Sequence, residues 1–308
     1  MKILASRRFP GPAWAELAEL ADIEYLAGPL SPQAGEHDNE IEALAVVGER
    51  VDEATLVRFP NLRIVANYGV GYDSIDIAAC AAGGVAVTNT PGVLTSATAD
   101  LTFALLLGVR RRLVVADRAV REGRWAGAWA DADFLGRDVS AGTLGIVGLG
   151  RIGRAVARRA KAFEMSVIHH SRTRREEGWR ELDELLAEAD AVTLHVPLTA
   201  ETRGLLDAAR LALLRDGACL VNTARGQIVD EGALVRELVS GRLEAGLDVF
   251  AYEPNVPQEL LGLPNVVLTP HIGSATAETR EAMTRVLVDN LLAIERGENP
   301  PNLVYPDS

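Results

Sequence analysis

Residues 145–153 read Gly-Ile-Val-Gly-Leu-Gly-Arg-Ile-Gly, and this stretch decides the fold of the 308-residue chain. It follows an apolar run and opens a segment with helical spacing. Gly148 permits a tight turn out of a strand, Gly150 lets the backbone approach a pyrophosphate, and Gly153 lets the helix pack closely. The helix N-terminus then offers N–H groups to the phosphates. This context favours a dinucleotide-binding turn over the alternative, a glycine turn with only a structural role.

Short apolar runs alternate with helical patterns on both sides of this stretch. Expected strands lie at residues 2–5, 43–47, 63–66, 85–88, 143–148, 166–170, 191–195, 217–222, 244–247 and 265–268. Expected helices lie between them at residues 12–20, 52–58, 76–82, 152–162, 180–188, 207–214 and 231–239. Such alternation predicts parallel strands with helices on both faces of the sheet.

Two longer helices are expected at residues 96–122 and 276–296, and an irregular stretch rich in Trp and Gly follows the first, at residues 123–142. Because single hydrophobic cores stop growing near ~250–300 residues, the chain length favours two domains. We therefore predict an α/β fold with two doubly wound parallel-sheet domains, Rossmann-like or flavodoxin-like.

The composition argues against several classes of protein. A net charge of −12 disfavours a nucleic-acid-binding protein and binding to an anionic membrane surface. The longest apolar stretches fall far short of a ~20-residue membrane span, and the first residues lack the apolar core of a signal peptide. Cys80 and Cys219 form no C-x-x-C pair, so we interpret them as reduced core residues rather than a disulfide or a catalytic thiol. We expect a cytoplasmic protein without a metal site.

The residues after the strand at 166–170 predict which nicotinamide dinucleotide binds. An Asp or Glu at this position usually holds the ribose 2′-hydroxyl of NAD, and it would repel a 2′-phosphate. Here the chain reads Ser171, Arg172 and Thr173, with no acid before Glu176. Hydroxyls and a guanidinium bind phosphate oxygens, so we predict that NADP(H) is preferred and NAD(H) remains possible. A solvated basic turn is the alternative.

Three motifs after later strands carry candidate catalytic residues. Arg225 follows the strand at 217–222, Glu253 follows Gly-Leu-Asp-Val-Phe at 246–250, and His271 lies in Thr-Pro-His-Ile-Gly-Ser at 269–274. In open α/β sheets ligands bind beyond these strand ends. A His can donate a proton to a carbonyl oxygen, a carboxylate beside it favours the imidazolium, and an Arg can polarise the carbonyl of a 2-keto acid. Taken singly, the Arg and the Glu could be surface charges and the His a structural residue.

Together these motifs resemble the D-isomer-specific 2-hydroxyacid dehydrogenase family, most closely its glyoxylate/hydroxypyruvate reductase branch. The resemblance covers essentially the whole chain, and its marks lie at residues 67–73, 88–100, 145–153, 195–199, 222–226, 246–250 and 270–276. It implies two similar domains with the active-site cleft between them. The substrate-binding domain would be discontinuous, with residues 1–95 and 280–308, and the dinucleotide-binding domain would span residues 96–279.

The resemblance also implies roles for individual residues. The family's catalytic residues fall on Arg225, Glu253 and His271, and the substrate carboxylate would meet the N–H groups of Val70 and Gly71 beside Arg225 and His271. The implied cofactor contacts are Thr98, Gly148, Gly150, Arg151, Ile152, Gly153, Ser171, Arg172, Thr173, Pro197, Thr202, Thr223, Ala224, Asp248 and Gly273, with Asp248 on the carboxamide.

Family members are usually homodimers, and residues 125–135 resemble the segment that packs against the partner. The chain departs from the family between Arg175 and Leu182, where the connection after the phosphate turn is shorter.

The function implied is NADPH-dependent reduction of a small 2-keto acid, glyoxylate to glycolate or hydroxypyruvate to D-glycerate. Alternatives within the enzyme class are a D-3-phosphoglycerate dehydrogenase and a 2-ketogluconate-type reductase. The first needs cations near the substrate loop, and residues 67–74 contain none. A dinucleotide-sensing binding protein without turnover is the alternative from another class, and a turnover assay separates the two.

Overall fold

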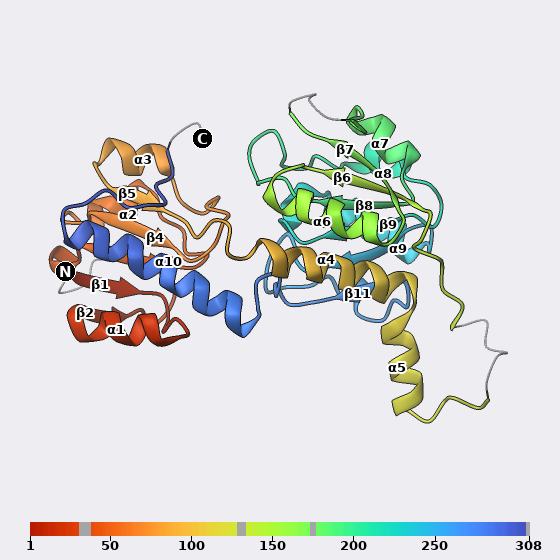
Figure 1. Cartoon of the computed structure of the whole chain (residues 1–308), viewed down its shortest axis with the longest axis horizontal. Coiled ribbons are helices and arrows are strands. Elements are labelled where there is room, and N and C mark those ends of the chain that lie inside the picture. The colour runs from red at the N-terminus through yellow and green to blue at the C-terminus, as the bar shows by residue number, and fades with distance from the viewer. Residues whose placement is uncertain (31–37, 128–133, 173–176, 306–308) are drawn as a thin grey trace. The chain divides into compact units, whose positions relative to one another are not determined.

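The computed structural model describes residues 1–30, 38–127, 134–172 and 177–305, which form two compact units (Figure 1). Unit 1 comprises Met1–Leu94 and Ser274–Ser308, and unit 2 comprises Thr95–Gly273. Each unit is built on a parallel sheet with helices packed against it. The predicted fold class, two parallel-sheet α/β domains, is confirmed.

The described residues of unit 1 form five parallel strands in the order β2-β1-β3-β4-β5. They are β1 (Lys2–Ala5), β2 (Asp22–Tyr25), β3 (Ala43–Val46), β4 (Ile64–Asn67) and β5 (Ala86–Thr88). All residues of β3 and β4 are buried, as expected for central strands of a sheet covered on both faces. Strand β2 was not predicted, because its sequence Asp-Ile-Glu-Tyr has no apolar run and it lies at the edge of the sheet.

The helices of unit 1 come from both ends of the chain. They are α1 (Pro12–Leu20), η1 (Asp38–Glu40), α2 (Glu53–Arg58), α3 (Ile77–Ala82) and α10 (Ala277–Glu295). Helix α10 packs on α1 and β4, and the Tyr68 hydroxyl donates to the Arg280 carbonyl oxygen at 2.7 Å. The C-terminal helix is thus part of the core of the N-terminal sheet.

In unit 2, the part of the chain that the structure describes forms six parallel strands in the order β11-β10-β9-β8-β6-β7. They are β6 (Thr143–Val147), β7 (Ser166–His170), β8 (Ala191–Leu194), β9 (Cys219–Asn222), β10 (Glu244–Leu247) and β11 (Val266–Leu268). The chain runs from β6 to β7 on one side and then to β8 on the other. The strand order therefore reverses between β6 and β8, which is where ligands bind in such sheets.

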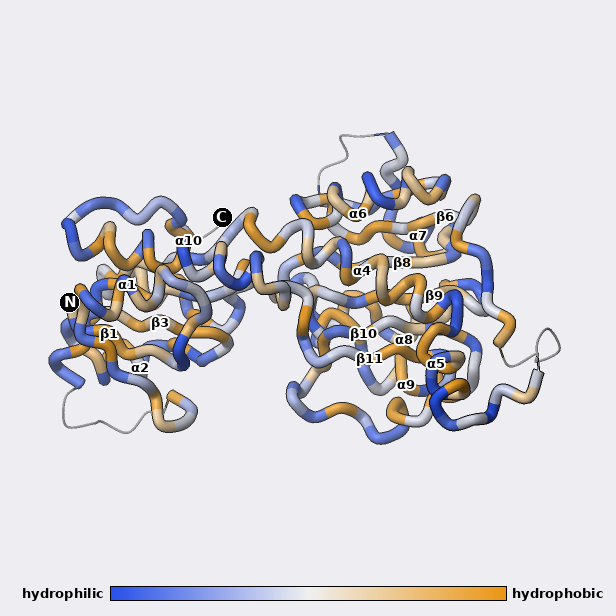
Figure 2. Tube along the Cα trace, turned by 60° about the horizontal axis from the view of Figure 1, so that its bottom comes forward, coloured by the Kyte–Doolittle hydropathy of each residue, from blue (hydrophilic) through white to orange (hydrophobic). Residues whose placement is uncertain are grey.

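Helices of unit 2 cover both faces of this second sheet, except α5, which extends from the end of α4 (Figure 1). They are α4 (Thr95–Arg110), α5 (Leu113–Arg121), α6 (Arg151–Ala162), α7 (Leu182–Glu188), α8 (Ala208–Leu213) and α9 (Glu231–Val239), with short turns η3 (Gly226–Ile228) and η4 (Gln258–Leu260). Leu105 and Val156 belong to the core under α4 and α6, whereas Leu185 and Leu238 belong to the core under α7, α8 and α9. The apolar residues gather along the strands and the inner helix faces (Figure 2).

The prediction of one helix at residues 96–122 is wrong. Helix α4 ends at Arg110 and α5 begins at Leu113, with Arg112 in the left-handed region at φ 50°. The Arg110 carbonyl oxygen accepts the Arg137 N–H at 2.7 Å, and Gly136 packs so closely there that a Cβ would overlap it. A segment distant in sequence therefore ends the helix, and a helical pattern unbroken by Pro could not reveal it.

Within the described ranges, we find no helix that is both long enough and apolar enough to cross a bilayer.

The Arg110 side chain anchors the end of α4 inside unit 2. Its guanidinium donates to the carbonyl oxygens of Gly217 and Asp190 and pairs with Glu244 at 3.1 Å, with only 6% of the Arg110 side chain exposed. Arg110→Ala would remove the closer partner of a largely buried carboxylate, leaving only Arg137 at 3.9 Å, and would free two backbone carbonyl oxygens, so we expect a loss of about 3 kcal/mol in the free energy of unfolding. Urea denaturation measures it.

The matched control is Arg121→Ala. Arg121 pairs with Asp117 on the exposed face of α5, where such pairs contribute about 0.3–0.5 kcal/mol. Equal losses in the two variants would contradict the anchoring role of Arg110.

Candidate active site

Three candidate catalytic residues lie in consecutive loops at one edge of the second sheet. Strands β9, β10 and β11 are neighbours, and their last residues, Asn222, Leu247 and Leu268, are in register. The loops that follow these strands carry Arg225, Glu253 and His271 respectively. Since parallel strands all end at the same edge, adjacency in the sheet brings the three loops together.

His271 and Glu253 form a hydrogen-bonded pair. The Nδ1 of His271 lies 2.8 Å from Oε2 of Glu253, and because a carboxylate only accepts, Nδ1 carries the proton. The other carboxylate oxygen, Oε1, accepts the Phe250 N–H at 3.1 Å. The His271 side chain is 48% exposed. The pair thus fixes the orientation of the imidazole, and the ring stays open to a substrate.

The charge state of Glu253 follows from opposing effects. Burial raises the pKa of its carboxyl, but the hydrogen bond and charge of His271, the Phe250 N–H and the charge of Arg225 together outweigh burial. The net pKa is lower than usual, so Glu253 is a carboxylate at neutral pH. A carboxylate in this position stabilises a protonated His271.

The loop that carries His271 is held by a buried carboxylate. Asp248 is fully buried and accepts the Thr269 hydroxyl at 2.6 Å and the N–H groups of Ile272 and Gly273 at 2.8 Å each. Burial raises the pKa of Asp248, against the effect of these hydrogen bonds. The backbone of His271 has φ 53°, a left-handed conformation that is uncommon for a residue other than Gly. The loop contacts of Asp248 hold His271 in this conformation.

The loop that carries Arg225 is held by Asn222. The Asn222 side chain accepts the Ala224 N–H at 3.0 Å and donates to the Arg225 carbonyl oxygen at 2.9 Å. The Arg225 guanidinium is half-buried and donates to the Ala224 carbonyl oxygen at 2.8 Å. Sequence reasoning missed the role of Asn222, although a side-chain amide directly after a strand, three residues before Arg225, is a signal for such a turn.

The glycine turn has the shape that a pyrophosphate needs. Gly148 has φ 99°, and a Cβ there would lie 2.6 Å from the His195 carbonyl oxygen, while a Cβ on Gly153 would overlap the Gly148 carbonyl oxygen. By contrast, a Cβ on Gly150 would meet no atom within 4 Å. Gly150 is the N-cap of α6, and no side chain caps the first N–H groups of the helix. These residues fit a dinucleotide phosphate.

The turn after β7 is described as far as Arg172. Ser171 is half-buried and Arg172 is exposed, whereas Thr173 lies outside the described residues. Trp179 Nε1 donates to the Ser171 carbonyl oxygen at 3.1 Å, and the residue forms a parallel bridge with His169 of β7. At Trp179 the chain therefore lies directly against the edge of the sheet. Trp179 was not among the residues predicted from the sequence, although a Trp in a stretch of charged residues is a signal that its ring packs against the protein.

The remaining predicted cofactor residues lie along the same edge of unit 2. Thr98 is buried in α4, and a Cβ on Gly273 would lie 3.6 Å from its hydroxyl oxygen. The Thr223 hydroxyl lies 3.1 Å from that of Thr102. The Thr202 hydroxyl donates to the Pro197 carbonyl oxygen at 2.6 Å, which closes the loop after β8. Arg151 and Ile152 directly follow the glycine turn, and Ala224 precedes Arg225 in its loop.

Val70 and Gly71 lie in unit 1, in the loop after β4. Their carbonyl oxygens accept from the side-chain amides of Asn89 and Asn67 respectively, at 2.9 Å each. In the described part of the chain, neither N–H donates a hydrogen bond. The loop therefore has two adjacent free donors, as an anion site requires.

No cluster of three or more His, Cys, Asp or Glu residues in the described ranges has the arrangement of a metal site. Cys80 and Cys219 are both buried thiols, and burial raises the pKa of Cys80 to about 11.

Known proteins resemble the chain along its whole length. A family model for the D-isomer specific 2-hydroxyacid dehydrogenase, NAD binding domain, matches residues 103–273. A glyoxylate reductase of Thermococcus litoralis is 46% identical over 99% of this chain and 97% of its own. A glyoxylate reductase of Pyrococcus horikoshii is 52% identical over 86% of this chain and 83% of its own.

A solved structure shows the same likeness. The NADPH-dependent glyoxylate/hydroxypyruvate reductase of Sinorhizobium meliloti, in complex with NADP and malonate, is 38% identical with a TM-score of 0.92. The match covers 98% of this chain and 96% of that one.

The lowered pKa of Glu253 predicts a pH-dependent contribution to stability. A carboxyl whose pKa is lowered in the folded state stabilises the protein above its ordinary value of 4.5, and this contribution is lost as the pH falls through the lowered pKa. Glu253→Gln should therefore unfold more easily than the native protein at about pH 5.5, and the difference should shrink as the pH falls below 4.5. Urea unfolding at several pH values measures it, with the exposed Glu259→Gln as the control. A difference that grows on acidification would refute this prediction.

Proposed function

The chain belongs to the D-isomer-specific 2-hydroxyacid dehydrogenase family and its glyoxylate reductase branch, and on that premise we propose that it reduces a small 2-keto acid with NADPH. The substrates proposed are glyoxylate, reduced to glycolate, and hydroxypyruvate, reduced to D-glycerate. The observation that carries the proposal is the His271–Glu253 hydrogen bond of 2.8 Å, at the sheet edge where Arg225 lies.

Each residue of the pair and Arg225 has a distinct task in this reaction. When bound, a reduced nicotinamide would supply the hydride for C2 of the keto acid. His271 donates the proton that the carbonyl oxygen takes up, through the ring nitrogen that is not bonded to Glu253. Glu253 keeps the imidazole oriented and stabilises its protonated form. Arg225 binds the substrate carboxylate and polarises the keto group.

The cofactor would be held by unit 2. Gly148, Gly150 and Gly153 form the phosphate turn, and the N-terminus of α6 supplies its donors. The free N–H groups of Val70 and Gly71 are proposed as donors to the substrate carboxylate.

Preference for NADPH over NADH is proposed from the turn after β7. Ser171 and Arg172 occupy the position where NAD-binding proteins carry an acid. The Sinorhizobium relative is described as NADPH-dependent and as a complex with NADP, which supports the same preference here. Kinetic constants for a panel of 2-keto acids with NADPH and with NADH test both parts of the proposal. Absence of turnover would favour a dinucleotide-sensing protein.

We also propose a cytoplasmic homodimer. Helix α5 and the residues after it carry exposed apolar side chains that a second copy would cover, namely Leu113, Val114, Val120, Trp125 and Leu135. The part of the predicted partner segment at residues 128–133 lies outside the described residues.

Loss of the proton donor should slow the chemical step. We expect His271→Ala to lower kcat for glyoxylate by about 10²–10⁴-fold, the usual contribution of a positioned acid. Binding of NADPH, followed by its fluorescence, should stay near the native level and so confirm that the variant is folded. Near-native turnover would remove His271 from the mechanism.

Loss of Arg172, the proposed ligand of the 2′-phosphate, should lower kcat/KM with NADPH but not with NADH. Because a hydrogen bond to a charged group contributes about 1.5–3 kcal/mol, Arg172→Ala should lower kcat/KM for NADPH by about 10–100-fold and leave that for NADH nearly unchanged. Arg236→Ala, which removes an exposed cation on α9, is the control. Equal losses with both cofactors would contradict the role of Arg172.

A further inference from the structure

The two catalytic loops meet at one residue, Ala251. Gly226 directly follows Arg225, and a Cβ on Gly226 would overlap the Phe250–Ala251 peptide. The Gln227 side-chain amide donates to the Ala251 carbonyl oxygen at 2.8 Å, and the Ala251 N–H donates to Glu231 Oε1 at 2.8 Å. Residues just after Arg225 thus bind both backbone polar groups of Ala251.

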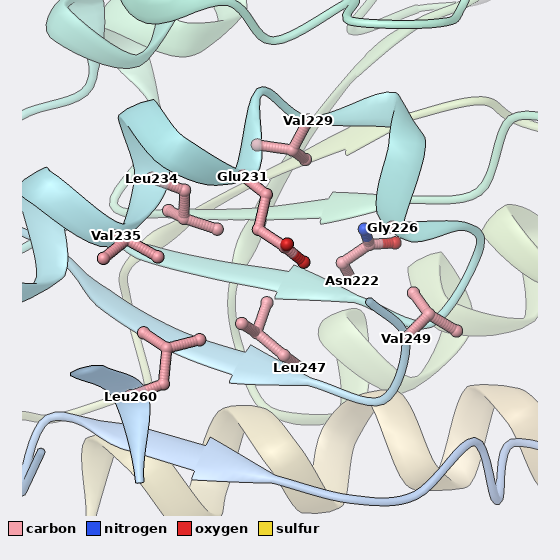
Figure 3. Close-up of a pocket in the computed structure, with 9 residues that line it drawn as sticks. All are labelled: Asn222, Gly226, Val229, Glu231, Leu234, Val235, Leu247, Val249 and Leu260. Carbon is pink, nitrogen blue, oxygen red and sulfur yellow. The ribbon is translucent and has the colours of Figure 1, made fainter. Parts of the chain in front are cut away.

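The hydrogen bond between Glu231 and the Ala251 N–H is not required to cap helix α9. It is the first residue of α9, where an acid usually interacts with the helix dipole. The N-cap of α9 is already provided by Asp230, whose side chain accepts the Ala233 N–H at 2.9 Å. The Glu231 carboxylate instead points away from α9 toward a cavity of about 10 Å³ behind the Arg225 loop, lined also by Asn222 and Leu247 (Figure 3).

The contact at Ala251 continues to the proton donor. Glu253 follows Ala251 by two residues, and its Oε1 accepts the N–H of Phe250, the residue before Ala251. Its Oε2 binds His271 at 2.8 Å. The backbone at Ala251 is thus directly connected to the carboxylate that orients His271.

We propose that Glu231, assisted by Gln227, is a positioning residue that sets the Glu253 loop in register with the Arg225 loop. It holds the His271–Glu253 pair at a fixed place relative to the Arg225 guanidinium, and it touches neither substrate nor cofactor. Its kinetic consequences rest on the proposed function, since they are read from reduction of a 2-keto acid. A displacement of about 1 Å at a reacting group can lower the rate about 10²-fold, so this register matters to catalysis.

Two variants of Glu231 test whether the hydrogen bond to the Ala251 N–H is what positions the Glu253 loop. Glu231→Ala removes the acceptor and leaves the Ala251 N–H without a partner, so we expect kcat to fall by about 10–100-fold while KM for NADPH changes little. The alkaline limb of the kcat–pH profile should move to lower pH, because the displaced carboxylate stabilises the imidazolium less. Glu231→Gln keeps an oxygen that accepts the N–H, and it should restore kcat to within about threefold.

A matched control uses Glu184, which accepts the Glu181 N–H at 3.4 Å at the start of α7 in the same unit. Glu184→Ala should leave kcat and the pH profile unchanged. Should Glu231→Ala fail to fold, Gln227→Ala removes the other bond to Ala251 and should change kcat and the pH profile in the same direction. Unchanged kinetics in a folded Glu231→Ala or in Gln227→Ala would overturn the proposal.

A double-mutant cycle tests whether Glu231 acts through Glu253. Because both affect the same pair, adding Glu231→Ala to Glu253→Gln should cause little further loss of kcat. Fully additive losses would show that Glu231 has only a structural role and would overturn the proposal.

A readout without turnover separates this proposal from the proposed function. In the NMR titration of His271, the midpoint should shift in Glu231→Ala and stay unchanged in Glu184→Ala. If the native enzyme reduces no 2-keto acid but the midpoint shifts, the proposed function fails and the positioning role stands. If the enzyme is active and the midpoint does not shift, the positioning role fails alone.

Discussion

A carboxylate removed from water must be hydrogen-bonded, and in Asp248 this requirement shapes the candidate active site. The two oxygens of Asp248 accept hydrogen bonds from three donors in the loop after β11. The conformation of that loop therefore depends on a carboxylate that directly follows β10. His271 lies within the loop and adopts a left-handed backbone there. The imidazole consequently faces Glu253, which lies in the loop of Asp248 itself.

The same dependence extends to neighbouring loops. Asn222 shapes the turn at Arg225, and Ala251 joins that turn to the loop of Glu253. Three consecutive strand ends thus become one constellation through side chains that do not take part in the chemistry. The parallel sheet supplies the rough proximity, and Asp248, Asn222 and Glu231 supply the final geometry.

The sequence predicted the fold class and offered candidate site residues, because both leave local patterns. Buried strands such as β3 and β4 are apolar runs, and the glycine turn has fixed spacing. Strand β2 and the helix break at Arg112 left no such pattern, since one is an edge strand and the other is imposed by Arg137. Likewise, Arg225, Glu253 and His271 could be named from motifs, but the roles of Glu231 and Trp179 depend on contacts between loops.

The discontinuity of unit 1 has a consequence for biosynthesis. Helix α10 packs on α1 and β4, yet it follows the whole of unit 2 in the chain. The ribosome therefore delivers the first five strands long before the helix that covers them, whereas unit 2 emerges as one uninterrupted segment. Domains of a nascent chain usually complete in N-to-C order. Here the second unit has all its segments first, and the apolar surface of unit 1 that α10 covers stays uncovered until the end of synthesis.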